Sequence, residues 1–599
     1  MKLKLLAVLT LSFVLAVTFF TFPPSFSEFP ANSQRSIAQL DRVRNVNTSI
    51  GYSTIQEAIN APDTLNGHVL ILDSIVFYEH VVVNKSVSLD GSIWLEHPEY
   101  RTVIDGNGTG DILSVESGNV RIGGIRITNG ANGIYLNEAD NCTIGWGLLE
   151  IVNNMQSGIC LRNSRNCTIL HSYVMNNHIG VSLTDSNAIT VSENSITGNY
   201  IGVYLTNSSD NIIQSNNVTS NTYYGIWLNS LTSKTIVQGN YVADNFQGIH
   251  CYESSCITVS ANMITDNYHG IFIDDSDDSV VVNNNITLNR DTGISSFFAL
   301  NASIIGNDIS RNKWCGVSLC VFRESIIAKN NVRANKEYGF VFRESLNNDY
   351  VGNNITDNGC GVLFCYWSEN NSFIHNNFID NLKQEDFVFC DPSSSPNVWD
   401  NGLEGNYWDD YNGTDLDHDG IGDSEYYANT SNTDHHPLMG AFSEFNATSM
   451  HHVCTICNST ISNFQFNGTT IGFNVASEDG TAGFCRICIP TALVNVTYKV
   501  FVNDTEVSCS LLPCSNSTHS YLYFNYTHST QPVIIIPEFP SFLILPLLIL
   551  ATLFTTMICR KKKQESQVPT CLSILEEQRT GVWLVENKYK PPTTYSSEQ

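Results

Sequence analysis

The sequence predicts an all-β protein whose main body is a parallel β-helix, and a regular repeat is the first reason. A glycine followed by an apolar residue recurs eleven times, at a first spacing of 25 residues and then of 22 or 23. These glycines are Gly133, Gly158, Gly180, Gly202, Gly225, Gly248, Gly270, Gly293, Gly316, Gly339 and Gly361. A unit this short cannot bury its own apolar face, so it must stack on its neighbours as a solenoid.

The second reason is the pattern inside each unit. Residues 202–205 and 270–273 alternate apolar and variable side chains, which is the period of a half-buried strand. Further apolar positions follow about eleven and about sixteen residues after each glycine. We therefore expect three short strands per unit and about 13 coils of 22–23 residues.

Asparagines are the third reason. They recur fourteen and nineteen residues after the glycines, as Asn284 and Asn289 do after Gly270. Asparagine tolerates left-handed turn conformations, and its side-chain amide can bond backbone groups at a bend. On stacked coils these residues can bond one another as a ladder, so we expect a structural role for them.

The repeat resembles the right-handed parallel β-helix proteins of the pectate-lyase-like superfamily. It is most similar to the branch of carbohydrate-binding and sugar-hydrolase domains that includes NosD, an accessory protein of nitrous oxide reductase maturation. The resemblance covers roughly residues 50–440. It implies the fold, but it does not imply an activity, because this fold carries lyases, hydrolases, epimerases, adhesins and inert spikes.

The chain of 599 residues is long enough for several domains. The predicted segments, in order, are a signal peptide or signal anchor (1–30), an N-terminal cap with the first coils (45–105), the β-helix repeats (106–400), an acidic closing segment (401–440), a small β-sandwich (441–536), a transmembrane anchor (537–563) and a cytoplasmic tail (564–599). Within the cap, residues 52–60 should form an amphipathic helix, because Thr54 and Glu57 have capping-box spacing.

One row of outward positions on the solenoid is aromatic. Tyr204, Trp227, His250 and Phe272 each lie two residues after a repeat glycine, so we expect them to stack on consecutive coils, exposed. A run of exposed aromatic side chains indicates a partner surface, and flat rings suit the faces of sugars. The alternatives are a ladder that only stabilises the sheet or a face covered by a loop.

An acidic edge follows the same strands. Clustered carboxylates can bind Ca²⁺ or supply an acid–base pair, and a solvated turn of an acidic protein is the alternative. For an enzyme, a polysaccharide lyase or a glycoside hydrolase, we would assign Glu253, Asp274 and Asp275 as catalytic carboxylates and His250 as the proton carrier. The Asp-Pro-His-Asp motif of related uronan epimerases is absent.

The closing segment contains a candidate Ca²⁺ loop. Asp415, Asp417, Asp419 and Asp423 occupy positions 1, 3, 5 and 9, with Gly420 at position 6. Alternate oxygens can converge on one ion while the glycine permits the sharp turn. Position 12 is a tyrosine rather than the glutamate of an EF-hand. We expect a structural Ca²⁺ site, or else an Asp- and Gly-rich turn without an ion.

Cysteine is frequent, with 18 residues, and disulfides are the default outside the cell. Cys142 and Cys167 should stack on adjacent coils as a disulfide or as two small apolar residues. Other cysteines recur at a spacing of five, as Cys315 and Cys320 do. Cys454-x-x-Cys457 has the spacing of a zinc site, and its neighbouring histidines and methionine would also suit copper.

Composition and both termini indicate an exterior, membrane-anchored protein. The net charge of −28 disfavours nucleic acid as a partner. Residues 542–559 are mostly apolar, can just span a bilayer and precede a basic cluster. Pro-Glu-Phe, an apolar span and basic residues resemble an archaeal PEF-type C-terminal sorting signal, although 36 residues follow the cluster here. Asn-x-Ser/Thr sequons are frequent, including Asn84, Asn107, Asn217, Asn285, Asn354, Asn446, Asn467 and Asn525.

Three functions follow as hypotheses. The first is a cell-surface protein that binds a carbohydrate or cell-surface glycan, and that modifies it if it is an enzyme. The second is a non-catalytic structural or adhesive surface protein. The third is a NosD-like accessory in copper-enzyme maturation. The near-constant repeat leaves little room for long loops, which favours binding or structure over catalysis.

Overall fold

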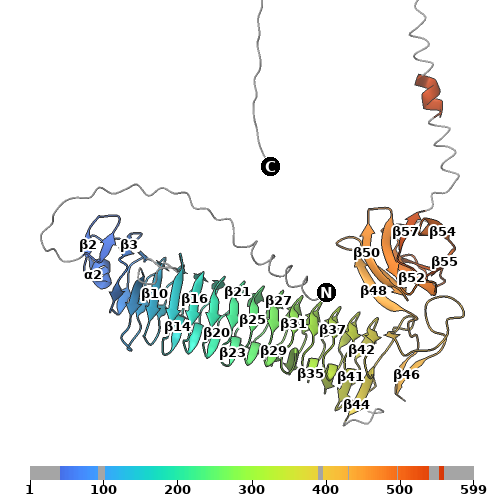
Figure 1. Cartoon of the computed structure of the whole chain (residues 1–599), viewed down its shortest axis with the longest axis horizontal. Coiled ribbons are helices and arrows are strands. Elements are labelled where there is room, and N and C mark those ends of the chain that lie inside the picture. Colours follow the sequence, from blue (N-terminus) through green and yellow to red (C-terminus); the bar gives the residue numbers. More distant parts are fainter. Residues whose placement is uncertain are drawn as a thin grey trace, which may run out of the picture. The chain divides into compact units, whose positions relative to one another are not determined.

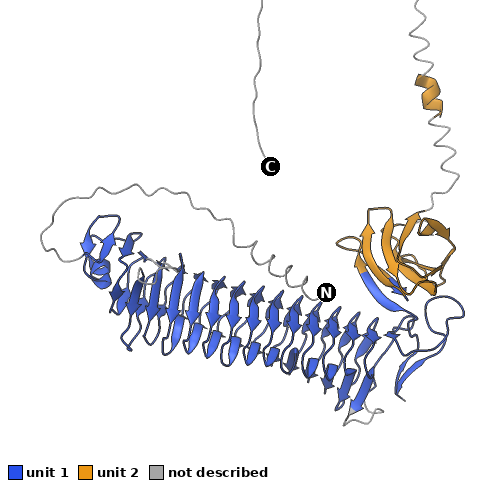
Figure 2. Cartoon of the chain, viewed as in Figure 1, with its two compact units in different colours: residues 1–444, 455–458 blue, residues 445–454, 459–599 orange. Residues whose placement is uncertain are grey.

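The computed structural model describes residues 41–91, 101–388, 396–429, 431–494, 497–537 and 552–558. They fall into two compact units, residues 1–444 with 455–458 and residues 445–454 with 459–599 (Figure 2). The predicted signal segment, 1–30, and the predicted tail, 564–599, lie outside the described residues.

The first unit is a solenoid of three long sheets, which we call A, B and C (Figure 1). Sheet A consists of β2 Gly51–Tyr52, β1 Val43–Asn45, β3 Val69–Leu72, β6 Ser88–Asp90, β9 Arg121–Gly123, β12 Thr143–Ile144, β15 Thr168–Leu170, β18 Thr190–Ser192, β21 Ile212–Gln214, β24 Ile236–Gln238, β27 Thr258–Ser260, β30 Val280–Val282, β33 Ser303–Ile305, β36 Ile326–Ala328, β39 Asp349–Val351 and β42 Ser372–Ile374. Sheet B consists of β4 Val76–Phe77, β7 Thr102–Asp105, β10 Ile125–Thr128, β13 Leu149–Val152, β16 Ser172–Met175, β19 Ser195–Thr197, β22 Asn217–Thr219, β25 Tyr241–Ala243, β28 Met263–Thr265, β31 Asn285–Thr287, β34 Asp308–Ser310, β37 Asn331–Arg333, β40 Asn354–Thr356, β43 Asn377–Ile379 and β45 Tyr407–Trp408. Sheet C consists of β5 Val81–Val83, β8 Leu113–Val115, β11 Ile134–Asn137, β14 Ser157–Arg162, β17 Ile179–Thr184, β20 Ile201–Thr206, β23 Tyr224–Asn229, β26 Gln247–Tyr252, β29 His269–Asp274, β32 Ile294–Phe297, β35 Cys315–Cys320, β38 Tyr338–Arg343, β41 Cys360–Cys365 and β44 Glu385–Val388.

Each coil contributes one strand to each sheet, and successive coils pair in parallel and in register, as β20 and β23 do through Val203 and Ile226. One apolar side chain per short strand points inward, and the interior is a continuous core of buried Ile, Val and Leu. The predicted β-helix of about 13 coils is confirmed.

The repeat glycines are required by close approach between coils. A Cβ atom on Gly270 would lie 2.4 Å from the carbonyl oxygen of Gly293 on the next coil and 2.9 Å from the side chain of Ile286. Because every coil presents the same contact to the next, the glycine recurs once per coil.

Asparagine ladders run through the interior, as predicted. In one of them the Nδ2 group of Asn284 donates to Asn307 Oδ1 at 3.0 Å and to the carbonyl of Val259 at 2.9 Å. Its Oδ1 accepts from the backbone amide and the Nδ2 group of Asn262, both at 2.9 Å. The ladder residues therefore replace backbone bonds at the bends of each coil.

The expected left-handed conformation lies one residue away from the ladder. Asn283 has φ 56° and Leu288 has φ 61°, whereas Asn284 and Asn289 are absent from the positive-φ residues. The prediction placed this conformation on the ladder asparagines and was wrong there, because the residue before each one makes the bend so that the asparagine amide can turn inward.

The N-terminal cap closes the first coil. Helix α2, Ile55–Asn60, has Thr54 as its N-cap, and Thr54 Oγ1 accepts from the Glu57 amide at 3.1 Å. The Glu57 carboxylate accepts from the amide of Ser53, the residue before the N-cap, at 3.0 Å, so the Thr54 half of the predicted capping box forms and the reciprocal bond is displaced by one residue. Strand β1 pairs antiparallel with β2 and β3, and β2 is the edge strand of sheet A.

Two buried tryptophans close the other end of the core. Trp399 Nε1 donates to Asn432 Oδ1 at 3.1 Å, and Trp408 Nε1 donates to Asp434 Oδ2 at 2.9 Å. Asn432 and Asp434 lie on β47 Asn432–Asp434, which pairs antiparallel with β46 Tyr426–Asn429. Asp434 also accepts from the Asn406 amide at 2.8 Å and so terminates a ladder. Burial raises the pKa of Asp434 to about 6.

Cys142 and Cys167 stack on adjacent coils, as predicted. The Cys142 amide donates to Cys167 Sγ at 3.3 Å, and both residues are buried thiols rather than a disulfide. Cys315 and Cys320 are the two ends of β35 and lie roughly 16 Å apart. A spacing of five therefore separates two cysteines along a strand instead of pairing them.

Residues 441–537 form two five-stranded sheets, most of whose residues belong to the second unit. One consists of β48 Ala441–Asn446, β49 His452–Cys457, β52 Ala482–Pro490, β56 His519–Thr527 and β55 Cys509–Leu511. The other consists of β50 Thr460–Phe466, β51 Ile471–Ala476, β57 Gln531–Pro537, β53 Tyr498–Val502 and β54 Thr505–Val507. The β-sandwich stays a prediction.

Most of the predicted anchor, 537–563, lies outside the described residues. Residues 552–558 form a short helix. Within the part of the chain that the structure describes, no helix combines the length and apolarity needed to cross a membrane.

Candidate binding face on sheet C

The predicted aromatic row forms on the outer face of sheet C. Tyr204 of β20 lies in register with Trp227 of β23, Trp227 with His250 of β26, and His250 with Phe272 of β29. The ring centroids of Tyr204 and Trp227 are 4.9 Å apart, and those of His250 and Phe272 are 5.0 Å apart. We call these four side chains the inner row.

The inner row is less exposed than predicted. Tyr204, Trp227 and Phe272 are half-buried, and His250 is only 8 % exposed. The expectation of exposure was wrong for His250, because the rings of Tyr224 and Tyr252 lie against it at 5.3 and 6.1 Å in addition to its two row neighbours.

A second row of rings, missed in the sequence, runs beside the first. The outer row lies two residues before the repeat glycines and consists of His178, Tyr200, Tyr223, Phe246 and Tyr268. Successive centroids are 5.0, 5.9, 5.0 and 5.0 Å apart. Tyr224 joins the rows, at 4.5 Å from Tyr223 and 4.4 Å from Trp227. The repeat register would have found this row had the turn positions been scanned as well as the strands.

The centre of this face contains buried polar atoms without hydrogen-bond partners among the described residues. They are Trp227 Nε1, Gln247 Oε1 and both ring nitrogens of His250. Burial, with a smaller contribution from His269, lowers the pKa of His250 to about 4, so the ring is neutral at pH 7. Unpartnered donors and acceptors of this kind are suited to hydroxyl groups, because a hydroxyl can both donate and accept a hydrogen bond.

The three predicted catalytic carboxylates, Glu253, Asp274 and Asp275, lie close enough for their charges to interact. The Glu253 amide donates to the Asp274 carbonyl at 3.0 Å, and Glu253 accepts from Ser230 Oγ at 2.9 Å. Burial, and then Asp275 and Glu253, raise the pKa of Asp274. Neither ring nitrogen of His250 bonds to these carboxylates, and the proton-carrier role of His250 stays a prediction.

The backbone gives Glu253 and Asp275 a structural role. They occupy the position that follows each sheet C strand, with φ 46° and 48°. Asp185 and Asn207 occupy the same position on other coils with φ 50° and 46°. Asp and Asn tolerate this left-handed conformation best among non-glycine residues, so the turn accounts for much of the acidic edge.

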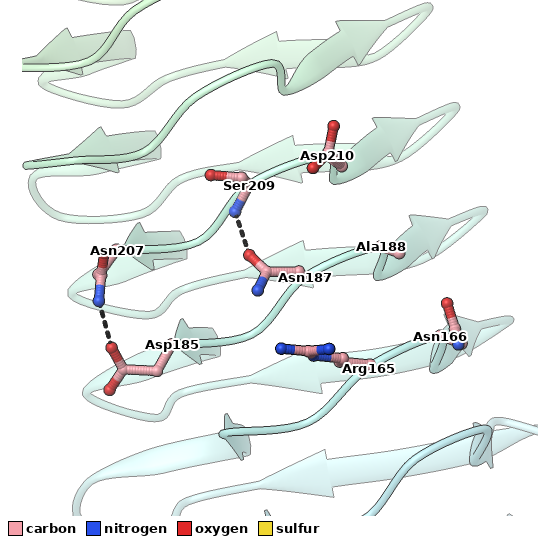
Figure 3. Close-up of a pocket in the computed structure, with 8 residues that line it drawn as sticks. All are labelled: Arg165, Asn166, Asp185, Asn187, Ala188, Asn207, Ser209 and Asp210. Atoms are coloured by element: carbon pink, nitrogen blue, oxygen red, sulfur yellow. Dashed lines mark hydrogen bonds between the residues drawn. The ribbon is translucent and has the colours of Figure 1, made fainter.

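A shallow pocket of about 510 Å³ lies between sheets C and A, away from the aromatic rows (Figure 3). Its polar groups largely satisfy one another: Asn207 Nδ2 donates to Asp185 at 2.5 Å, and the Ser209 amide donates to Asn187 Oδ1 at 2.6 Å. Arg165 is the one cation in its lining. Because these turn residues repeat coil after coil, we do not place the functional site there.

Three of the four predicted Ca²⁺ ligands converge. Carboxylate oxygens of Asp415, Asp417 and Asp419 lie within 4.8 Å of one another, and Gly420 makes the turn with φ 85°. Asp423 lies outside this group; it accepts from the Leu416 amide at 2.7 Å and braces the loop. Asp423 is therefore a loop-closing residue, and a Ca²⁺ ion bound by the other three remains a prediction.

Comparison with known proteins assigns the solenoid. The model of the periplasmic copper-binding protein (NosD) family matches residues 228–413, and the model of the right-handed β-helix region matches residues 110–264. Residues 110–413 of the repeat region are thus similar to the NosD and right-handed β-helix families. A cell surface glycoprotein of Methanothermus fervidus is 35 % identical over 114 residues, which are 19 % of this chain and 18 % of that protein. The chain thus matches less than a fifth of that relative.

Solved structures with similar topology include the A-module of the mannuronan C-5 epimerase AlgE6 of Azotobacter vinelandii. It is 16 % identical, covers 57 % of this chain and 92 % of its own, and has a TM-score of 0.35. The periplasmic alginate epimerase AlgG is 13 % identical over 54 % of this chain and 85 % of its own, with a TM-score of 0.35. At these scores we draw no conclusion from them.

Proposed function

We propose that this chain is a cell-surface β-helix protein that binds carbohydrate on the outer face of sheet C. The observation that carries the proposal is the pair of aromatic rows on consecutive coils, with unpartnered donors and acceptors at their centre. Sugars present apolar faces to rings and hydroxyls to polar atoms, so one ligand class would satisfy both features.

The location follows from the relative and from the sequence. The matching segment of a cell surface glycoprotein supports placement at the cell surface, and the apolar residues 542–559 support a membrane anchor. A Ca²⁺ ion at Asp415, Asp417 and Asp419 would stabilise the end of the solenoid.

We propose binding rather than catalysis. The near-constant repeat of 22 or 23 residues leaves little room for the long loops that would form a catalytic cleft beside the acidic edge. A neutral His250 can still donate or accept one hydrogen bond to a hydroxyl.

A structural or adhesive surface role is the second candidate, because the outer rings lie against one another. The stacked rings of His178 and Tyr200 are nearly parallel, with an interplanar angle of 4°, and those of Phe246 and Tyr268 with an angle of 10°, so each ring presents mostly its edge to solvent. A ladder of this kind stabilises the sheet without any ligand. The NosD-like role in copper-enzyme maturation rests on the family match alone.

A glycan array probed with the purified chain, with and without Ca²⁺ and with acidic polysaccharides included, tests the proposal. We expect binding of defined glycans without new product masses. Chain shortening or unsaturated products in mass spectrometry would instead establish an enzyme. A folded protein that binds no glycan would favour the structural role.

A further inference from the structure

The outer face of sheet B carries sequons in a regular row. Asn217, Asn285 and Asn354 are the first residues of β22, β31 and β40, and each begins an Asn-aliphatic-Thr sequence. The three strands are separated by three coils each in the order of sheet B. At about 4.8 Å per coil, successive sequons lie about 14 Å apart.

Strand alternation presents these sequons to solvent. In each one the middle residue, Val218, Ile286 or Ile355, is buried in the core. The asparagine and the threonine point away from the core, where the asparagine is exposed and the threonine is half-buried. The acceptor asparagine and its hydroxyl partner therefore share the outer face.

The side-chain nitrogens of the row are available. Among the described residues, the Nδ2 atoms of Asn217, Asn285 and Asn354 donate no hydrogen bond that would have to break; Asn354 uses only its Oδ1, which accepts from Asn377 at 2.6 Å. In two sequons that lie in turns, the side-chain nitrogen of the asparagine already donates a hydrogen bond. Asn207 Nδ2 donates to Asp185, and Asn301 Nδ2 donates to Asp278.

Sheet C is the opposite case. None of its described strands contains a sequon. The buried ladder asparagines also lie outside sequons, as Asn284-Asn-Ile and Asn289-Arg-Asp illustrate. Sequons are therefore confined to surfaces other than the aromatic face and the interior.

We propose that Asn217, Asn285 and Asn354 carry N-linked glycans, which form a row along sheet B and leave the aromatic face of sheet C bare. In the modification, Nδ2 loses a proton and forms a C–N bond to the anomeric carbon of a sugar activated as a lipid-linked phosphate ester. The anomeric C–O bond breaks, and the phosphate leaves with the electron pair. The inference needs the exported location proposed above, but not the carbohydrate ligand.

The chain supplies a matched control in the same row. Asn331 is the register partner of Asn354, but Arg333 stands where the sequon needs Ser or Thr. Its side chain is part-buried at the same outer edge and makes a 3.3 Å bond to Asp308. Asn331 must therefore remain unmodified even where Asn354 is modified.

Glycopeptide mass spectrometry of the full chain isolated from its native cells tests the proposal. We expect glycans on Asn217, Asn285 and Asn354, none on Asn331 and none on the ladder asparagines, and loss of one glycan mass in Asn285→Gln. Unmodified peptides at the row with glycans elsewhere would overturn this inference alone. An absence of glycans at every sequon would overturn both this inference and the proposed exported location.

Discussion

The outer faces of sheets B and C are built on the same coils, yet they carry different chemistry. Sheet C presents Tyr204, Trp227 and Phe272 beside a second row of rings. Sheet B presents exposed polar residues such as Asn217 and Asn285, with the exposed side chains of Tyr241 and its register partner Met263 between them. The coils that form both faces are stabilised by the same interior asparagine ladders.

This difference separates what the fold requires from what it leaves free. Inward positions and ladder positions are occupied by the same residue types on nearly every coil, because each coil must fit the next. Outward positions have no such constraint. A run of similar side chains on consecutive coils of an outer face, such as the rings of sheet C, therefore indicates a partner surface.

Disrupting the shared interior should have the largest effect, because both faces depend on it. Asn284→Ala removes three donated and two accepted side-chain bonds and leaves the buried Asn262 amide without its acceptor. We expect the free energy of unfolding to fall by about 4 kcal/mol in urea titrations followed by circular dichroism.

The neighbouring Asn285→Ala is the control, because Asn285 is exposed on sheet B. It should change stability by less than about 0.5 kcal/mol. Equal losses for the two variants would contradict the division between interior and outer positions.

The stability of the chain should depend on pH through His250, which is buried on the outer face of sheet C. The pKa of His250 is lowered from 6.5 to about 4 by burial, so the unfolded chain binds the proton more readily. The stability that His250 contributes is present above about pH 6.5 and is lost as pH falls toward 4, up to roughly 3 kcal/mol.

Thermal unfolding across this pH range compares the wild-type chain with His250→Phe, which keeps a ring in the row. The variant should lose less stability on acidification than the wild type. Identical pH profiles for the two proteins would show that His250 is not buried as described.

Calcium should have the smallest effect on stability. Its predicted site lies at the end of the solenoid and belongs to neither face. If the ion binds Asp415, Asp417 and Asp419, Ca²⁺ at tenfold its Kd should stabilise the chain by about 1.4 kcal/mol. Asp417→Asn should weaken this response, whereas Asp185→Asn, in a distant turn, should leave it unchanged. A response that Asp417→Asn does not alter would place any bound Ca²⁺ elsewhere.

Much of the fold was predictable because its signals are local and periodic. The Gly270 spacing, the Asn284 ladder and the Thr54 half of the capping box each follow from residue type and register. The left-handed residue before each ladder asparagine was misplaced by one position, because sequence alone does not show which of two adjacent asparagines, Asn283 or Asn284, makes the bend.

The site was less predictable because its properties arise between coils. His250 is buried by Tyr224 and Tyr252, whose side chains lie on strand positions that the sequence did not link to the row. Asp423 is diverted from the acidic group by the Leu416 amide. His250 is covered by neighbouring rings, and Asp423 is held by a backbone amide. Folding brings both sets of contacts together, and residue spacing alone does not show them.

The most direct test of the account compares Trp227→Ala with Tyr241→Ala. Trp227 lies on β23 of sheet C, and Tyr241 is an exposed ring on β25 of sheet B, two strands later in the chain. Isothermal titration with a glycan identified on the array should show that Trp227→Ala weakens binding at least about tenfold, a loss of about 1.4 kcal/mol, while Tyr241→Ala leaves it within about twofold. Unchanged binding in Trp227→Ala, or an equal loss in Tyr241→Ala, would contradict a carbohydrate site on the face of sheet C.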